Sequence, residues 1–341
     1  MYPPTGPDGP SPLPIQEPVD RYDEFVPVVV PPPQPPNHGK LWVQLTLLAA
    51  TVVTTTLVGG CHYYSFATDL STINDVPASA APPVLFSDPL FWLRGLWYSL
   101  TILAILGCHE MGHYLACLRY GVDVTRPYFL PAPLPLTGTL GAFIRIRSRI
   151  PNKIALFDIG IAGPLAGFVV AVPALFIGLW LSRVDRMPAD ASNLMELGEP
   201  LLFRFAAWLV WGHVADGYTI NMHPMAFAAW FGLLATALNL FPIAQLDGGH
   251  ISYAVFGRRS TAITIVMIGV AIALTFVSSS WIAWTVLLVI MIVTMGPRHP
   301  PTLDEDEPLD RGRLILAAVA LVVLIVCFTP APIGPFIGAG G

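Results

Sequence analysis

The sequence predicts an all-α polytopic membrane protein with about six to seven transmembrane helices and a small β-hairpin or sheet element at the membrane face. Three observations lead to this fold class. Hydrophobic residues make up 54% of the 341 positions and charged residues only 11%, whereas charged residues are about a quarter of an ordinary soluble domain. Several apolar stretches approach the roughly 20 residues that cross a bilayer as a helix. One proline-rich stretch between them cannot be a regular helix.

The N-terminal segment, residues 1–40, is rich in proline and carries acidic residues, as in MYPPTGPDGPSPLP. Such a composition cannot bury enough apolar surface to fold, so we predict a disordered cytoplasmic tail. A ligand for a proline-recognition module is an alternative that the composition leaves open. The segment has neither the basic start and apolar core of a signal peptide nor the Arg and Ser bias of a transit peptide. Neither cleavage nor import is therefore predicted.

Apolar stretches after the tail predict the membrane-spanning helices. They are residues 41–64, 90–118, 154–182, 224–243, 261–278, 281–296 and 313–329. A shorter stretch, residues 201–214, contains Arg204 and is predicted to lie at the membrane interface. The chain thus divides into the tail (1–40), a first transmembrane helix with an external loop (41–89), a central membrane core (90–260) and C-terminal transmembrane helices (261–341). The acidic segment DEDEPLD (304–310) is expected to be solvated.

The distribution of positive charge predicts the orientation of these helices. If the tail is cytoplasmic, all but four of the 17 Lys and Arg residues fall on the cytoplasmic side. The exceptions are Arg94, Arg183, Arg186 and Arg204. This bias places the C-terminal end of the second apolar stretch toward the cytoplasm. The net charge of −5, without a basic stripe interleaved with aromatic residues, argues against nucleic acid as a partner.

The connection between the second and third apolar stretches reads RPYFLPAPLPLTGTLGAFIRIRSRIPNK. Its prolines exclude a regular helix, and FIRIRSRI alternates with the period of two that is typical of a strand. We therefore predict a β-hairpin or short sheet, with a strand over residues 140–149. The alternative is an amphipathic loop whose arginines meet lipid headgroups. An exposed strand edge would be important if the protein must hold an unwound peptide, because an extended peptide can add to such an edge through backbone hydrogen bonds.

The motif HEMGH, at the C-terminal end of the second apolar stretch, places three ionisable side chains in a lipid-compatible helix. His109 and His113 are four residues apart and share one helix face, so two imidazoles can hold one metal ion. Glu110 can reach a water molecule beside the metal without being a ligand. The alternative is a set of polar residues that bond neighbouring helices. Because a buried ionisable glutamate is costly in a membrane, the functional interpretation is favoured.

A catalytic zinc site needs a third protein ligand and one open position. Asp247 is favoured, because Pro242 breaks the fourth apolar stretch and the glycines at 248 and 249 allow a sharp turn that points Asp247 back into the bundle. The other candidates in or near apolar segments are Asp158, His213, His223 and His250. Asp158 is expected to cap its helix or to pair with an arginine. The three histidines are expected to be ordinary interfacial or flanking residues, unless His250 supports the ligands.

Three motifs in this order, HEMGH, GIAGPLAG (160–167) and NLFPIAQLDGG, resemble those of the site-2 protease family of intramembrane zinc metalloproteases. The resemblance covers about residues 90–260 and implies that this region contains the three-helix catalytic core that the family shares. It implies one Zn²⁺ per chain, with His109, His113 and Asp247 as ligands. It also implies Glu110 as the catalytic acid and base, and Asn239 as a residue that engages the substrate peptide. The chain lacks a recognisable PDZ insertion, so substrate selection must work otherwise.

The resemblance also implies what the protein would act on. The expected substrate is a membrane-anchored protein, cut within or near its transmembrane segment in regulated intramembrane proteolysis, with membrane lipids as the other partner. The expected location is a bacterial inner membrane, with the active site toward the cytoplasm. A catalytically inactive membrane metalloprotein and a metal transporter remain alternatives, although transporters usually carry polar residues along several spans. The oligomeric state is not predicted.

Overall fold

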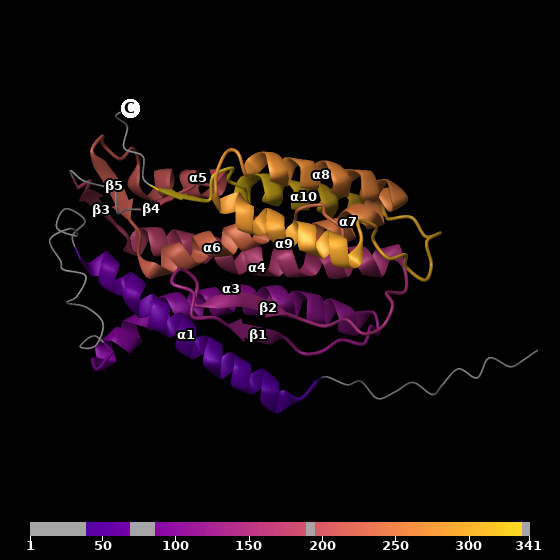
Figure 1. Ribbon diagram of the computed structural model, residues 1–341, viewed down its shortest axis with the longest axis horizontal. Helices are drawn as coiled ribbons and strands as arrows, with labels where there is room; N and C mark the ends of the chain where they lie inside the picture. Colours follow the sequence, from indigo (N-terminus) through magenta and orange to yellow (C-terminus); the bar gives the residue numbers. More distant parts are fainter. Residues whose placement is uncertain (1–38, 69–85, 189–194, 336–341) are drawn as a thin grey trace, which may run out of the picture. The chain divides into compact units, whose positions relative to one another are not determined.

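The computed structural model describes residues 39–68, 86–188 and 195–335. The predicted tail, residues 1–40, lies outside these ranges except for its last two positions. Within them the chain is mostly helical, and short strands form antiparallel pairs (Figure 1). The helices are α1 (Leu41–Ala67), α3 (Pro89–Arg119), α4 (Lys153–Leu181), α5 (Leu201–Trp211), α6 (Pro224–Asn239), α7 (Asp247–Phe256), η3 (Gly257–Arg259), α8 (Ser260–Leu274), α9 (Ser280–Met295) and α10 (Arg311–Cys327). The strand pairs are β1 (Tyr128–Pro131) with β2 (Thr139–Phe143), β3 (Arg183–Arg186) with β5 (Tyr218–Asn221), and β4 (Met195–Leu197) with β6 (Ile333–Pro335).

Four helical stretches among the described residues are long and apolar enough to cross a membrane. They are α1, α3, α4 and the continuous run of α7, η3 and α8. The mostly helical class is therefore confirmed, whereas the prediction of six to seven spans is not. Helices α6 and α9 have 16 residues each and α10 has 17, at or below the lower limit of about 17 for a span. The predicted span 224–243 is shorter in the structure, because its last residues leave the helix ahead of Pro242.

Local sequence signals set where two of the long helices begin. The Asp88 carboxylate accepts a hydrogen bond from the main-chain N–H of Leu90, and Pro89 occupies the first helical position of α3. Asn152 caps α4 in the same way through the N–H of Ala155. These caps satisfy main-chain donors that the first turn of a helix leaves without a partner. The starts of α3 and α4 therefore lie within a residue of those predicted from the sequence.

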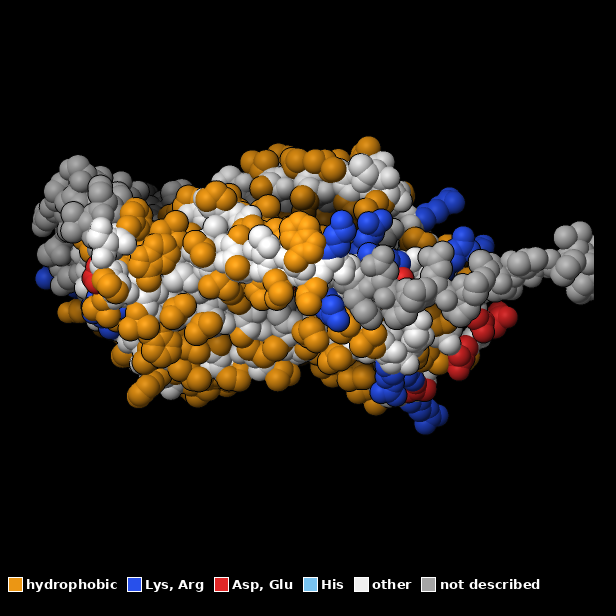
Figure 2. Space-filling view, turned by 90° about the horizontal axis from the view of Figure 1, so that it is seen from below, with side chains coloured by type: hydrophobic (Ala, Val, Ile, Leu, Met, Phe, Trp, Pro, Cys, Tyr) orange, Lys and Arg blue, Asp and Glu red, His pale blue; other side chains and the backbone are white. Residues whose placement is uncertain are grey.

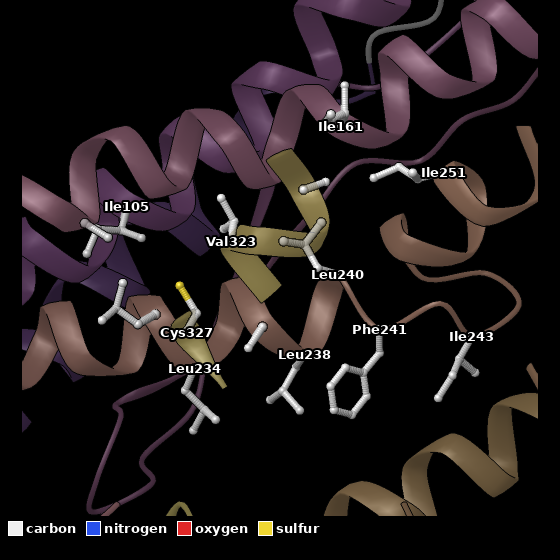
Figure 3. Close-up of a cluster of buried hydrophobic side chains, with 14 of the residues drawn as sticks. Ile105, Ile161, Leu234, Leu238, Leu240, Phe241, Ile243, Ile251, Val323 and Cys327 are labelled. Atoms are coloured by element: carbon white, nitrogen blue, oxygen red, sulfur yellow. The ribbon is translucent and has the colours of Figure 1, made fainter. Parts of the chain in front are cut away.

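Helices α3, α4 and α6 pack against one another, and α1 packs on α3. The largest cluster of buried hydrophobic side chains joins α3, α4 and α6 to α7 and α10. Figure 3 shows α10 within this cluster, where Val323 and Cys327 lie among side chains of α6 and the following loop, such as Leu234 and Leu240. The C-terminal helix is thus part of the packed core rather than an appendage to it.

The predicted hairpin is present and consists of β1 and β2, which pair antiparallel with Tyr128 opposite Phe143. It lies beside α1 and α3 (Figure 1). The aromatic rings of this pair stack with their centroids 5.5 Å apart. Strand β2 covers Thr139–Phe143, whereas the predicted strand covers residues 140–149. Residues 144–150, the rest of the alternating FIRIRSRI segment, form no further strand, and Ile146 makes an isolated bridge to Val124.

The outer surface carries many large apolar side chains, as expected of helices that face lipid. Val293 of α9 is 78% exposed and Trp180 of α4 is 73% exposed. Figure 2 shows one face, on which hydrophobic side chains cover most of the surface and Lys and Arg side chains gather mainly toward one end. An apolar surface of this extent is typical of a protein that lies in a membrane.

Candidate metal centre

Side chains from two helices converge on one point: His109 and His113 of α3, and Asp247 of α7. The Nε2 atoms of the two histidines lie 3.1 Å apart. The Asp247 carboxylate places Oδ2 at 3.2 Å from Nε2 of His109 and Oδ1 at 3.2 Å from Nε2 of His113. Across the described ranges, no other group of three such side chains could hold a metal ion. The structure therefore brings together the three ligands expected from the sequence.

The two histidines share a face of α3 because positions four apart on a helix lie one above the other. Helix α4 passes close to that face because it carries glycines there. A Cβ built at Gly167 would stand 3.2 Å from the Cβ of His109, and Gly163 lies against the ring of His113. The segment GIAGPLAG, which the sequence marks as a close-packing face, thus leaves the space that the imidazoles fill.

The main chain of α4 also fixes the proton on one of these rings. Nδ1 of His113 lies 2.7 Å from the carbonyl oxygen of Ile159. Because a carbonyl only accepts hydrogen bonds, Nδ1 carries the proton and donates, and the lone pair is left on Nε2. Metal-binding histidines usually have this arrangement, with the second ring nitrogen held by a carbonyl or carboxylate.

The donor atoms fit a zinc ion in both spacing and kind. With metal–ligand distances near 2.0–2.2 Å, the donor atoms of a tetrahedral zinc site stand about 3.3 Å apart. Here the two Nε2 atoms lie 3.1 Å apart, and each lies 3.2 Å from one of the two carboxylate oxygens of Asp247. Lone pairs this close repel one another unless a cation or a proton lies between them. Two imidazole nitrogens and one carboxylate oxygen are a common ligand set of catalytic zinc sites, which leave the fourth position for water or substrate.

A tight loop between α6 and α7 carries Asp247 to the histidines. The loop contains Pro242, which cannot continue a helix, and Ala244, whose φ of +36° is uncommon for a residue with a side chain. Asp247 is the first residue of α7. Neither glycine of the LDGG motif has a positive φ, so they allow the sharp turn by their lack of a side chain and not by a left-handed conformation. Their role is close packing, because a Cβ at Gly248 would stand 2.0 Å from the carbonyl oxygen of Leu240.

The two residues expected to be catalytic come from different helices, α3 and α6. Glu110 follows His109 in α3, is only 8% exposed, and its carboxyl group interacts with the backbone of Ile144 just beyond β2. Asn239 is the last residue of α6, and its Nδ2 lies 3.3 Å from Nε2 of His109. A carboxyl group and an amide group thus lie near the ligands without belonging to the ligand set.

The remaining candidate ligands have other partners or lie elsewhere. Asp158 pairs with Arg313, with Oδ2 at 2.7 Å from Nη2, so the expectation that it pairs with an arginine is confirmed. His223 caps α6, since its Nδ1 accepts a hydrogen bond from the main-chain N–H of Met225. His213 is exposed at the end of α5. The structure does not bring these three residues to the metal centre.

Most residues of the acidic segment (304–310) between α9 and α10 are exposed, as expected, but the segment is also attached to the core. The main-chain N–H groups of Leu303 and Asp304 donate to the carbonyl oxygens of Ile150 and Pro151, at 3.2 and 2.9 Å. Lys153 of α4 donates to the carbonyl oxygen of Glu305. Main-chain hydrogen bonds depend little on side-chain type, which is why the sequence carried no signal for this attachment.

His299, in the same segment, contacts the helix that carries Asp247. Its Nε2 lies 2.6 Å from Nδ1 of His250, and its ring stacks on Tyr253 with the centroids 4.6 Å apart. Burial lowers the pKa of His299, because it disfavours the charged imidazolium. His250 is thus a neighbour of the metal centre with its own histidine partner, and sequence reasoning did not single out His299.

Comparison with known proteins is consistent with this geometry. Residues 97–277 match the family model described as peptidase family M50. Similar curated proteins include a "probable zinc metalloprotease EGY1, chloroplastic" of Oryza sativa subsp. japonica, 30% identical over 319 residues that cover 87% of this chain and 52% of the relative. Another is a "probable zinc metalloprotease EGY2, chloroplastic" of Arabidopsis thaliana, 30% identical over 263 residues, which cover 74% of this chain and 46% of the relative. The chain spans about half the length of these relatives.

Proposed function

Because the chain belongs to peptidase family M50, the site-2 protease family, we propose that it is an intramembrane zinc metalloprotease. It hydrolyses a peptide bond within or near the transmembrane segment of a membrane-anchored protein. One observation carries the proposal: His109 and His113 of α3 meet Asp247 of α7 with donor atoms at zinc-site spacing, and Glu110 is beside them. His109, His113 and Asp247 are the proposed zinc ligands.

The proposed chemistry divides between the metal and the side chains around it. When bound, zinc acts as a Lewis acid on a carbonyl group and on water. Glu110 accepts the proton of the attacking water and later delivers it to the leaving amine. Asn239, whose amide lies 3.3 Å from His109, donates a hydrogen bond to the negative charge that develops on the carbonyl oxygen. Both roles require side chains that lie close to the metal without being its ligands.

The substrate must be unwound where it is cut, because a helix occupies its own carbonyl groups with main-chain hydrogen bonds. The hairpin of β1 and β2 supports a way to hold the unwound segment. Among the described residues β2 pairs only with β1, and the chain just beyond β2 contacts Glu110 through Ile144. An unwound substrate segment that adds to β2 as a third strand would run past the proposed acid and base.

The membrane in which the protein acts is a further part of the proposal. Helices able to span a membrane make it an integral membrane protein, so substrates are membrane proteins and lipids surround it. The similar curated proteins are named as chloroplastic, so they lend no support to the predicted bacterial inner membrane. The proposed orientation, with the metal centre toward the cytoplasmic side, is supported only by the charge distribution of the loops.

A reconstituted cleavage assay tests the function. The purified protein is placed in liposomes with a single-span membrane protein, with and without 1,10-phenanthroline, and zinc is then added back. We expect a cleavage product that disappears with the chelator and returns with zinc. Zinc uptake into the liposome lumen without a product would instead indicate a transporter. Bound zinc with neither cleavage nor uptake would indicate an inactive metalloprotein.

A further inference from the structure

Arg313, in the first turn of α10, makes a two-pronged ion pair with Asp158 of α4. Its Nε donates to Oδ1 at 2.8 Å and its Nη2 donates to Oδ2 at 2.7 Å. The side chain also bonds Asp310, which caps the same helix. Paired hydrogen bonds between a guanidinium and a carboxylate fix both the distance and the orientation of the two groups. The end of α4 therefore has a defined position relative to α10.

The same carboxylate also fixes the end of α3. The hydroxyl group of Tyr120 donates to Oδ2 of Asp158, and Nη2 of Arg313 lies 3.4 Å from that hydroxyl oxygen. Tyr120 is the residue that ends α3, the helix that carries both histidines. The Tyr120–Asp158–Arg313 cluster thus joins three helices at one point, and none of its members touches the metal centre.

The cluster is one residue away from the group that orients a zinc ligand. Asp158 is followed by Ile159, whose carbonyl oxygen accepts the Nδ1–H of His113 at 2.7 Å. Any shift or rotation of α4 at Asp158 is carried directly to that carbonyl, because adjacent residues of a helix move together. The distance and direction of the hydrogen bond to His113 then change, and with them the direction in which Nε2 points.

We propose that Arg313 is a positioning residue of the metal centre. Through Asp158 it holds the Ile159 carbonyl group where it orients His113, so that α10 contributes to zinc affinity from outside the ligand set. This inference rests on the proposed zinc site. It gives a role to a helix that has no ligand and that packs into the same core as α4 and α6.

The size of the expected effect follows from known metal sites. Loss of a group that bonds directly to a metal-binding histidine costs about 10- to 100-fold in metal affinity. Arg313 does not bond to His113 itself but acts through Asp158 and the Ile159 carbonyl group. We therefore expect zinc affinity to fall by about tenfold, near the lower end of that range. Lysine at this position keeps the charge but cannot make two parallel hydrogen bonds, so it should restore only part of the affinity.

Zinc affinity of the full-length protein in detergent tests the inference, measured by competition with a chromogenic chelator. The variants are Arg313→Ala, Arg313→Lys and Tyr120→Phe, with Arg311→Ala as the control. Arg311 lies two residues earlier in α10 and is exposed. The visible absorption of the cobalt-loaded protein is recorded in parallel, because it reports ligand geometry and does not respond to stability alone.

We expect Arg313→Ala to weaken zinc binding about tenfold and to change the cobalt spectrum, with smaller changes in Arg313→Lys and Tyr120→Phe and none in Arg311→Ala. Wild-type affinity and spectrum in folded Arg313→Ala would overturn the inference, as would an equal loss in the control. Should Arg313→Ala fail to fold, wild-type affinity in both Arg313→Lys and Tyr120→Phe would overturn it. Failure of the wild-type protein to bind zinc would instead refute the proposed function.

Discussion

Gly163 of α4 lies directly against the imidazole of His113: a Cβ built at this glycine would stand 2.1 Å from Nε2. No atom can occupy that position without displacing the ring. The same imidazole is held from its other nitrogen by the carbonyl group of Ile159. One short stretch of α4 therefore both makes room for a proposed zinc ligand and sets its direction.

Gly163→Ala is accordingly expected to push the His113 ring out of place and to abolish stoichiometric zinc binding. Overpacking of this kind also costs about 1–3 kcal/mol of stability. Gly269→Ala in α8 is the matched control, since a Cβ there meets nothing within 4 Å. Bound zinc is measured by atomic emission on the purified proteins. A full zinc complement in Gly163→Ala would mean that His113 is not a ligand.

Glu110→Gln is expected to abolish cleavage while leaving zinc content near that of the wild type. The amide has a similar size but cannot accept and return a proton, and Glu110 is not in the ligand set. The decrease in kcat should be at least about 100-fold. Cleavage of a reconstituted single-span substrate and zinc content are measured on the same preparation. Retained cleavage would show that Glu110 is not the catalytic acid and base.

Asp247→Ala and His109→Ala are each expected to lose most of the bound zinc, because either change leaves only two protein ligands for a site that needs three. His213→Ala, which alters an exposed histidine at the end of α5, should keep its zinc. The measurement is the ratio of zinc to protein after dialysis. One zinc per chain in Asp247→Ala would assign the third ligand to another residue.

Asn239→Ala is expected to lower the rate of cleavage without changing metal binding. Its amide nitrogen lies 3.3 Å from His109 and, as proposed, stabilises charge on the substrate. Loss of one such donor lowers kcat by about 100- to 1,000-fold, whereas zinc content should stay unchanged. The assay compares kcat, KM and bound zinc for the variant and the wild type. A variant that loses zinc but regains activity with added zinc would show that Asn239 supports the ligands instead.

Acid pH is expected to release the segment between α9 and α10. Burial lowers the pKa of His299, so the attached segment favours the neutral ring and binds fewer protons than the released one. The attachment is therefore stable above the ordinary histidine pKa of about 6.5 and weakens as the pH falls below it. The groups that face His299 are His250, Tyr253 and Glu305.

Hydrogen exchange measures the release of the segment at the main-chain N–H groups of Leu303 and Asp304. These groups donate to the carbonyl oxygens of residues 150 and 151 when the segment is attached. Their protection factors should decrease between pH 7 and pH 5, after correction for the intrinsic rate. In His299→Gln, which cannot be protonated, that decrease should be absent. Equal pH dependence in the variant and the wild type would contradict the assignment to His299.

Local patterns in the chain predicted the helical class, the hairpin and the proposed ligand set. Spacing of four residues places His109 and His113 together on any helix, and Pro242 ends α6 wherever the rest of the chain lies. These features depend on neighbours within about one turn, so they can be read without coordinates. The length of β2 and the positive φ of Ala244 ahead of Asp247 were not predicted, because main-chain pairing and the path of the loop determine them.

The sequence by itself determined the apolar helices, the histidine pair with its neighbouring glutamate, and the residue types able to complete a zinc site. Only the tertiary structure decided that the Asp247 carboxylate reaches both imidazoles, that the Ile159 carbonyl orients His113, and that Arg313 holds Asp158 from 155 positions away. The reason is physical. Helical periodicity is a property of adjacent residues, whereas the distance between side chains of different helices depends on how all of the helices pack.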